Sequence, residues 1–188
     1  MSPTLHLLDA TTQTWRTFTR PVRVLEIHTL ADILPALHEI DRAVTQSGLW
    51  AAGFLAYEAA PAFDPAMLTH PPVEGLPLLW FGLYELPIVN GQFPIPNSQL
   101  IIDHSQLAIS SSPSAYHTAL AQIKTHIAAG DTYQVNYTLR LRAPLPSSPL
   151  PLFSASPSPL FSPAPLPPYA AHLDLGRFVI SSASPELF

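Results

Sequence analysis

Apolar and polar residues alternate along residues 130–143, which read GDTYQVNYTLRLRA. One set of alternate positions is apolar, and the other carries amides, hydroxyls and two guanidinium groups. A repeat of two residues is typical of a β-strand, because successive side chains point to opposite faces of a sheet. The pattern therefore predicts a strand with one apolar face and one polar face, and the polar face looks either at water or at a ligand.

Two segments have the spacing of amphipathic helices instead. In residues 29–48, apolar side chains recur every three or four positions, with Asp32 as the candidate N-cap and Gly48 as the stop. Residues 112–130 repeat this arrangement, with Ser112 as the N-cap, a proline at the first helical position and a glycine at the end. The sequence predicts a helix in each segment.

The remaining regular segments are predicted strands. Residues 49–57 and 76–84 are apolar on both faces, as in strands that are covered on both sides. A shorter apolar strand lies around residues 5–8, and residues 169–188 form two strands around the turn DLGR. This order of elements predicts an α+β fold, with a mixed, largely antiparallel sheet and flanking helices.

Proline interrupts the regular pattern in residues 143–168, where it occupies ten of the 26 positions. This composition cannot sustain a helix and favours polyproline II or irregular chain.

Composition narrows the class of protein. Of the 188 residues, 47% are hydrophobic and 11% are charged, so a sizeable core is expected. With eight Lys and Arg residues and a net charge of −5, the chain lacks the basic stripe that nucleic-acid binding needs. There is no cysteine, which excludes disulfides and thiol chemistry. We find no signal peptide, and the most apolar window, residues 76–89, is too short to span a bilayer, so a cytoplasmic protein without membrane contact is expected.

Some polar side chains could carry chemistry. Gln134, Asn136 and Arg140 share the polar face of the alternating segment and form a set of donors suited to carboxylates. The solvated outer face of an antiparallel sheet has the same pattern, so spacing alone leaves both interpretations open.

Two glutamates follow predicted strands. Glu58 comes after a buried strand, directly behind Tyr57, which we expect in the core. Glu186 follows the last strand and a proline, where it could act in a site or lie in solvent. The eight histidines have no metal-ligand spacing and are expected at surface or hydrogen-bonded positions.

Three segments together resemble one family. They are GFLAYEAAPAFDPA (53–66), IAAGDTYQVNYTLRLRA (127–143) and the pair PYAAHLDLG and SSASPELF within residues 168–188. In this order they resemble aminodeoxychorismate synthase component I, a chorismate-utilising enzyme related to anthranilate synthase component I. The forms YEAAPAFDPA and GDTYQVNYT are closer to the aminodeoxychorismate branch, and the anthranilate branch is the alternative.

The resemblance implies a fold of two stacked antiparallel sheets with helices outside. It also implies an amino-terminal subdomain of component I over residues 1–111 and a truncated start of the chorismate-binding core over residues 112–188, which contains the proline-rich segment 143–168. It implies that chorismate, bound with Mg²⁺, reacts with ammonia that a glutamine amidotransferase subunit supplies, giving 4-amino-4-deoxychorismate for 4-aminobenzoate and folate. Glu186 matches the glutamate of the family's S-P-E-x-F motif, which acts as an acid or base. Pro168, Tyr169 and Ala170 match a stretch that forms part of a tryptophan pocket in some members, whose other wall is the amino-terminal strand.

The chain also departs from the family pattern. Its proline-rich segment stands where relatives have a helix, and it stops at Phe188, before the motif that holds the nucleophilic lysine of the aminodeoxychorismate branch. The ligands for Mg²⁺ are expected outside this chain as well. We therefore expect the amino-terminal portion of a component I, inactive by itself. The alternative is a non-catalytic module that binds tryptophan or docks the amidotransferase.

Overall fold

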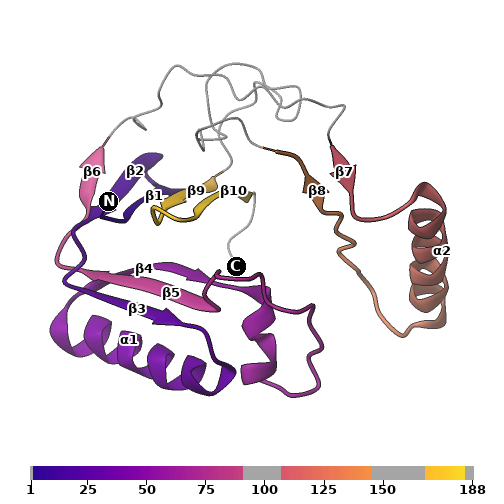
Figure 1. Cartoon of the computed structure of the whole chain (residues 1–188), viewed down its shortest axis with the longest axis horizontal. Coiled ribbons are helices and arrows are strands. Elements are labelled where there is room, and N and C mark those ends of the chain that lie inside the picture. The colour runs from indigo at the N-terminus through magenta and orange to yellow at the C-terminus, as the bar shows by residue number, and fades with distance from the viewer. Residues whose placement is uncertain (1, 91–106, 145–167, 185–188) are drawn as a thin grey trace. The chain divides into compact units, whose positions relative to one another are not determined.

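The computed structural model describes residues 2–90, 107–144 and 168–184 (Figure 1). The chain forms two compact units. The first unit comprises residues 1–98 and 151–188, and the second unit comprises residues 99–150.

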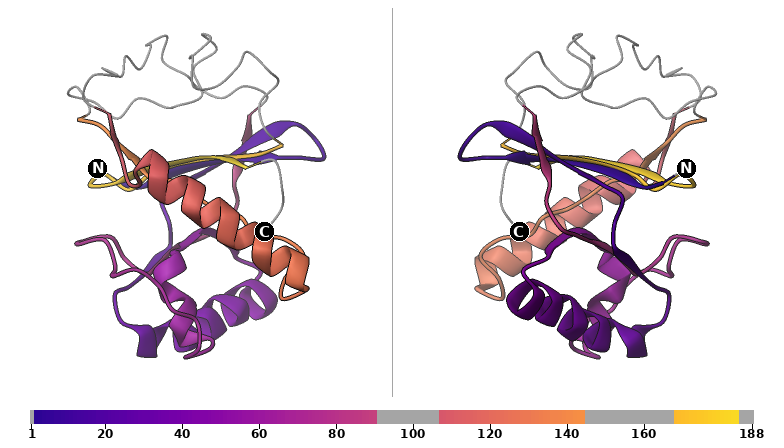
Figure 2. Two further views of the ribbon diagram at one scale, coloured as in Figure 1. Left: turned by 90° about the vertical axis from the view of Figure 1, so that its right-hand side faces the viewer. Right: turned by 90° about the vertical axis from the view of Figure 1, so that its left-hand side faces the viewer.

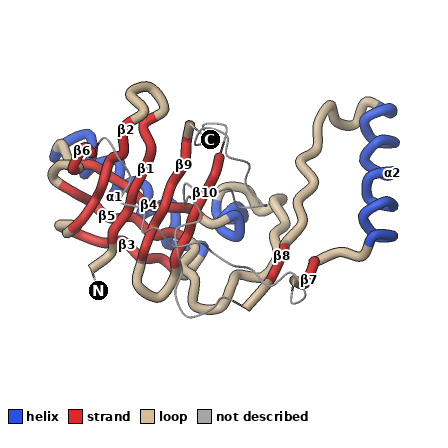
Figure 3. The backbone as a smooth tube through the Cα atoms, turned by 90° about the horizontal axis from the view of Figure 1, so that it is seen from above, coloured by secondary structure: helices blue, strands red, loops and turns tan. Residues whose placement is uncertain are grey.

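A five-stranded sheet in the first unit joins the two ends of the chain. Its strands are antiparallel to their neighbours and follow the order β10-β9-β1-β2-β6 (Figure 3). They are β1 (Thr4–Asp9), β2 (Thr14–Thr19), β6 (Ile88–Asn90), β9 (Tyr169–Asp174) and β10 (Val179–Ser184). The predicted first strand and the predicted hairpin around DLGR are confirmed, and the hairpin pairs with β1.

A second, three-stranded sheet has the order β3-β5-β4 and is also antiparallel. Its strands are β3 (Arg23–Ile27), β4 (Trp50–Leu55) and β5 (Leu79–Tyr84). The prediction of a strand buried on both faces holds for the central strand β5, in which every residue except Phe81 is buried. It is wrong for β4, where only Ala52 is buried, because β4 is an edge strand of this sheet.

The first unit is built in three layers: the five-stranded sheet, the three-stranded sheet and helix α1 (Ile33–Ser47) (Figure 2). Two buried clusters hold these layers together by removing apolar surface from water. The cluster between the sheets contains Leu5, Phe18, Ala52, Trp80, Tyr84 and Leu173. The cluster between the three-stranded sheet and α1 contains Leu25, Ile33, Ala36, Ile40, Ala59, Leu78, Leu79 and Leu83.

Helix α1 has the ends that the sequence predicts. It follows a short 3-10 helix, η1 (Leu30–Asp32), with Asp32 at the N-cap position. Gly48 ends it with a φ of 67°, a left-handed conformation that glycine adopts without strain. Asp32 makes no capping hydrogen bond, and its carboxylate instead accepts one from the Thr29 hydroxyl.

The second unit contains the other predicted helix, α2 (Pro113–Ala129). The Ser112 hydroxyl accepts the Ala115 N–H at 3.2 Å, and Gly130 ends the helix with a φ of 82°. A pair of two-residue strands, β7 (Ala108–Ile109) and β8 (Leu141–Arg142), completes the described part of this unit.

The predicted strand over residues 130–143 is wrong for most of its length. Only β8 at its end is a strand, and the Tyr133 side chain is 92% exposed. A strand takes its hydrogen bonds from a neighbouring strand, and β7 offers only two residues to pair with. Between residues 107 and 144 no residue is buried, so the apolar face of this segment is uncovered in the described structure.

The structure confirms the predicted α+β class, with antiparallel sheets and flanking helices. The proline-rich segment 143–168 lies almost entirely outside the described residues, and the subdomain division at residue 111 stays a prediction. Among the residues that are described, no helix has the length and apolar character needed to cross a membrane. The cytoplasmic location also stays a prediction.

Candidate functional site

Glu186, the predicted acid or base, lies outside the described residues. Strand β10 ends at Ser184, two positions before it. The part of the candidate site that can be described is therefore the hairpin β9–β10 and the strands beside it.

The predicted tryptophan-pocket residues begin strand β9. Pro168 and Tyr169 are half-buried, and Ala170 is 1% exposed. Ala170 packs with Leu8 of β1 and Trp15 of β2 in a buried cluster. The sheet thus places this stretch beside the amino-terminal strand, which is the neighbour that the family resemblance implies for such a pocket.

Asp9, at the end of β1, is held in a tight turn. Its Oδ1 accepts the backbone N–H groups of Thr11 and Thr12, each at 3.0 Å, and its Oδ2 accepts Arg16 Nε at 3.1 Å. The hydrogen bond from Thr12, followed by the one from Arg16, lowers the pKa of Asp9 to about 2. The Arg16 guanidinium also lies 5.2 Å from the ring centre of Trp50, so it connects this turn to the three-stranded sheet.

Two histidines share the outer face of the five-stranded sheet. His6 of β1 lies opposite His172 of β9, and their rings are stacked with centres 6.2 Å apart. His6 Nδ1 is 2.9 Å from the Thr17 hydroxyl, and His172 Nδ1 is 2.8 Å from the Ser181 hydroxyl. Burial lowers the pKa of both histidines.

The sequence by itself predicts only surface or hydrogen-bonded positions for these two histidines. Each one stands between two apolar residues, in LHLLD and in AAHLD, so its side chain points to the sheet face opposite to theirs. That signal could have indicated the face, but only the strand register shows that the two rings meet.

The three predicted substrate-binding residues lie in the second unit and are exposed. Gln134 Nε2 donates to Asn136 Oδ1 at 3.2 Å, so the structure brings these two amides together. The backbone N–H of Arg140 donates to the Ser110 hydroxyl at 3.0 Å, which anchors the segment to β7. Their role in binding chorismate stays a prediction.

The second candidate carboxylate, Glu58, does not end a strand. Strand β4 stops at Leu55, and Glu58 lies half-buried in the first turn of a 3-10 helix, η2 (Tyr57–Ala62). The expectation that Tyr57 is in the core is wrong, since its side chain is 86% exposed. Tyr57 is predicted on the inner face because side chains alternate along a strand. This alternation stops where the chain leaves the strand and enters the 3-10 helix.

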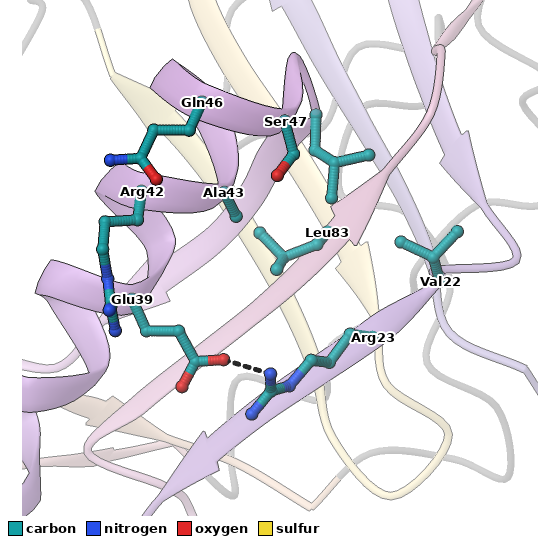
Figure 4. Close-up of a pocket in the computed structure, with 9 residues that line it drawn as sticks. Val22, Arg23, Glu39, Arg42, Ala43, Gln46, Ser47 and Leu83 are labelled. Atoms are coloured by element: carbon teal, nitrogen blue, oxygen red, sulfur yellow. Dashed lines mark ion pairs between the residues drawn. The ribbon is translucent and has the colours of Figure 1, made fainter.

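A cavity of about 420 Å³ lies where α1 meets the three-stranded sheet. Figure 4 shows Glu39 reaching from α1 to Arg23 of β3, with which it forms an ion pair. None of the residues singled out from the sequence lines this cavity. Its lining consists of Val22, Arg23, Glu39, Arg42, Ala43, Gln46, Ser47, Leu49 and Leu83.

The described residues form no metal site. Within residues 2–90, 107–144 and 168–184, no group of three or more His, Cys, Asp or Glu side chains is arranged to hold an ion. Mg²⁺ therefore stays a prediction from the family resemblance.

Two comparisons with known proteins indicate which family the chain resembles. Residues 96–188 match the chorismate binding enzymes. The chain is also 43% identical over 72 residues to anthranilate synthase component 1 of Thermus thermophilus. These comparisons support the chorismate-utilising enzyme family.

The matched segment covers 38% of this chain and 14% of the length of the Thermus relative. No solved structure matches the chain significantly. The family resemblance is thus supported at the level of chorismate-utilising enzymes, and the aminodeoxychorismate branch stays a prediction.

Proposed function

We propose that the chain is part of an aminodeoxychorismate synthase component I. This enzyme converts chorismate and ammonia to 4-amino-4-deoxychorismate, a precursor of 4-aminobenzoate and folate. The observation that supports the proposal is the match of residues 96–188 to the chorismate binding enzymes, a range that includes both GDTYQVNYT and SPELF. The choice of branch rests on the form of the sequence motifs.

In this proposal Glu186 acts as the acid or base. Moving a proton beside a dianionic substrate needs a carboxyl group with an adjusted pKa at a fixed position. The proposed support is hairpin β9–β10, which ends at Ser184, two positions before Glu186, and which is paired along its length and joined to β1. Gln134, Asn136 and Arg140 are the donors proposed for the substrate carboxylates.

Mg²⁺ and an amidotransferase subunit complete the proposed reaction. The ion neutralises carboxylate charge on chorismate, and we place its ligands in parts of the enzyme other than this chain. The amidotransferase supplies ammonia from glutamine. Both are taken from the family resemblance.

We further propose that the 188 residues alone do not catalyse the reaction. The described part of the second unit has no buried residue, although residues 133–141 alternate as a half-buried strand does. An uncovered apolar face of this kind is typical of a surface that packs against another part of a protein. Its natural cover in this proposal is the remainder of a chorismate-binding domain.

Two alternatives each have one supporting observation. Anthranilate synthase component I is favoured by the match to the Thermus relative. A non-catalytic tryptophan-binding module is supported by the contact of Ala170 with Leu8 of β1 and Trp15 of β2, because the resemblance expects Ala170 and the amino-terminal strand to be neighbours in such a pocket.

The test joins this chain in frame to the carboxy-terminal remainder of an aminodeoxychorismate synthase component I. The joined protein and the chain alone are incubated with chorismate, Mg²⁺ and an ammonium salt, and the products are identified by mass spectrometry. We expect 4-amino-4-deoxychorismate from the joined protein only. Glu186→Gln should abolish it, whereas Glu74→Gln, a control at an exposed loop position, should not.

Other outcomes decide between the alternatives. Anthranilate as the product would overturn the branch in favour of the first alternative. Conversion by the chain alone would contradict the claim that more of the domain is required. An inactive joined protein, together with calorimetric binding of tryptophan to the chain, would favour the binding module.

A further inference from the structure

A row of polar side chains crosses four strands of the five-stranded sheet. His6 of β1 lies opposite Thr17 of β2 on one side and His172 of β9 on the other, and His172 lies opposite Ser181 of β10. The neighbours Leu5 and Leu173 point into the cluster between the two sheets, so the row lies on the opposite, outer face. We call Thr17, His6, His172 and Ser181 together the histidine row.

The histidine row is well fixed. Hydroxyl groups of Thr17 and Ser181 hold the two Nδ1 atoms at 2.9 and 2.8 Å, and the rings are stacked with an interplanar angle of 25°. Thr17 is 7% and His172 is 8% exposed, so half of the row is shielded from water. Each of these two hydrogen bonds lies within one hairpin, and the stacked rings meet across the β1–β9 strand pairing that joins the two hairpins.

We propose that the histidine row is a proton-sensitive clasp, which fastens hairpin β9–β10 to hairpin β1–β2 while both imidazoles are neutral and loosens it when they are protonated. Stacked imidazolium ions would place two positive charges next to each other across the β1–β9 junction. The charges would repel at the contact that joins the hairpins.

The electrostatic surroundings agree with this direction. Burial lowers the pKa of both histidines, and for His6 the charge of His172 lowers it further. Asp174 lies two residues after His172, on the same face of β9. Its negative charge raises the pKa of His172, but the lowering by burial is larger. The other members of the row, Thr17 and Ser181, are neutral at all relevant pH values.

The sign of the pH dependence follows by linkage. Both pKa values lie below the usual 6.5 in the folded protein. Well above pH 6.5 the histidines are neutral whether or not the hairpin is docked, so protonation does not weaken docking there. As the pH falls below 6.5, the undocked state takes up protons first, and docking weakens until the pH passes the lowered pKa values.

The clasp has a consequence that rests on the proposed function. Hairpin β9–β10 begins with Tyr169 and Ala170 and ends at Ser184, two residues before Glu186. His6 and His172 would then be positioning residues, because they hold the support of the proposed acid or base. Acidification would displace that support.

The test is amide hydrogen exchange of the whole chain at pH 7.5 and pH 5.0, expressed as protection factors so that the intrinsic pH dependence cancels. Strands β3 and β5 of the same unit are the internal reference. In the unmodified chain, β9 and β10 should lose protection at pH 5.0 relative to β3 and β5. The double variant His6→Gln/His172→Gln, neutral at both pH values, should lose none.

The control variant is His38→Gln, which removes an exposed histidine of α1 and should behave as the unmodified chain does. Unchanged protection of β9–β10 in the unmodified chain, or the same loss in the double variant, would overturn the clasp. If the double variant does not fold, NMR titration of the unmodified chain decides. A pKa at or above 6.5 for His6 or His172 would then overturn it. None of these readouts depends on chorismate chemistry, so the clasp and the proposed function fail separately.

Discussion

The helices of the two units have similar local signals but different surroundings. Helix α1 ends at Gly48 and α2 ends at Gly130, and both glycines are left-handed. Yet α1 buries three residues against the three-stranded sheet, whereas α2 buries none among the described residues. The comparison shows that local sequence determines where a helix forms, and that only a packed sheet turns its apolar face into a core.

The strands repeat this contrast. Strand β5 has a partner on each side and a layer on each face, and it is almost completely buried. Residues 133–141 have the alternation of a strand, but β7 pairs with only two positions at their end. The apolar face of the second unit is thus a surface that still lacks its cover in the described structure, as the proposed function requires.

The largest expected effect is a difference between two leucines. Leu79 is fully buried in β5, so Leu79→Ala should cost about 2–5 kcal/mol of the free energy of unfolding. Leu139 of the second unit is exposed, so Leu139→Ala should change it by less than about 0.5 kcal/mol. Denaturant unfolding followed by tryptophan fluorescence reports on the first unit, which contains all three tryptophans. Equal costs would remove the contrast between the units.

A smaller effect separates the two helix starts. The Ser112 hydroxyl caps α2, so Ser112→Ala should destabilise that helix by about 1 kcal/mol. Asp32 makes no capping bond to α1, and Asp32→Ala should therefore cost less. Helix content by circular dichroism at increasing temperature measures both. A greater loss of helix content from Asp32→Ala than from Ser112→Ala would contradict this difference between the two helix starts.

The smallest effect appears only in acid. The pKa of Asp9 is about 2 instead of 3.8, so its contribution to stability is present above pH 3.8 and is lost as the pH falls toward 2. Asp9→Asn should remove this part of the acid dependence of thermal unfolding. Asp131→Asn is the matched change in the second unit, where the ion pair with His126 is exposed and should contribute little. An identical acid profile for all three proteins would contradict the role of the Asp9 turn.

The sequence was sufficient for elements with local signals. Both helices, their glycine ends and the carboxy-terminal hairpin are where capping and turn residues predict them. It was insufficient where partners matter: alternation in residues 130–143 predicted a strand that mostly has no neighbour to pair with. The meeting of His6 with His172 depends on pairing between opposite ends of the chain, which no local pattern reveals.

The central claim is that residues 107–144 belong to a larger chorismate-binding body. Hydrogen exchange of this segment, in the chain alone and joined to the remainder of a component I, tests it most directly. We predict near-intrinsic exchange across residues 133–141 in the isolated chain while β5 stays protected, and strong protection of both in the joined protein. If residues 133–141 were protected as strongly in the isolated chain as in the joined protein, the claim that they belong to a larger body would be contradicted.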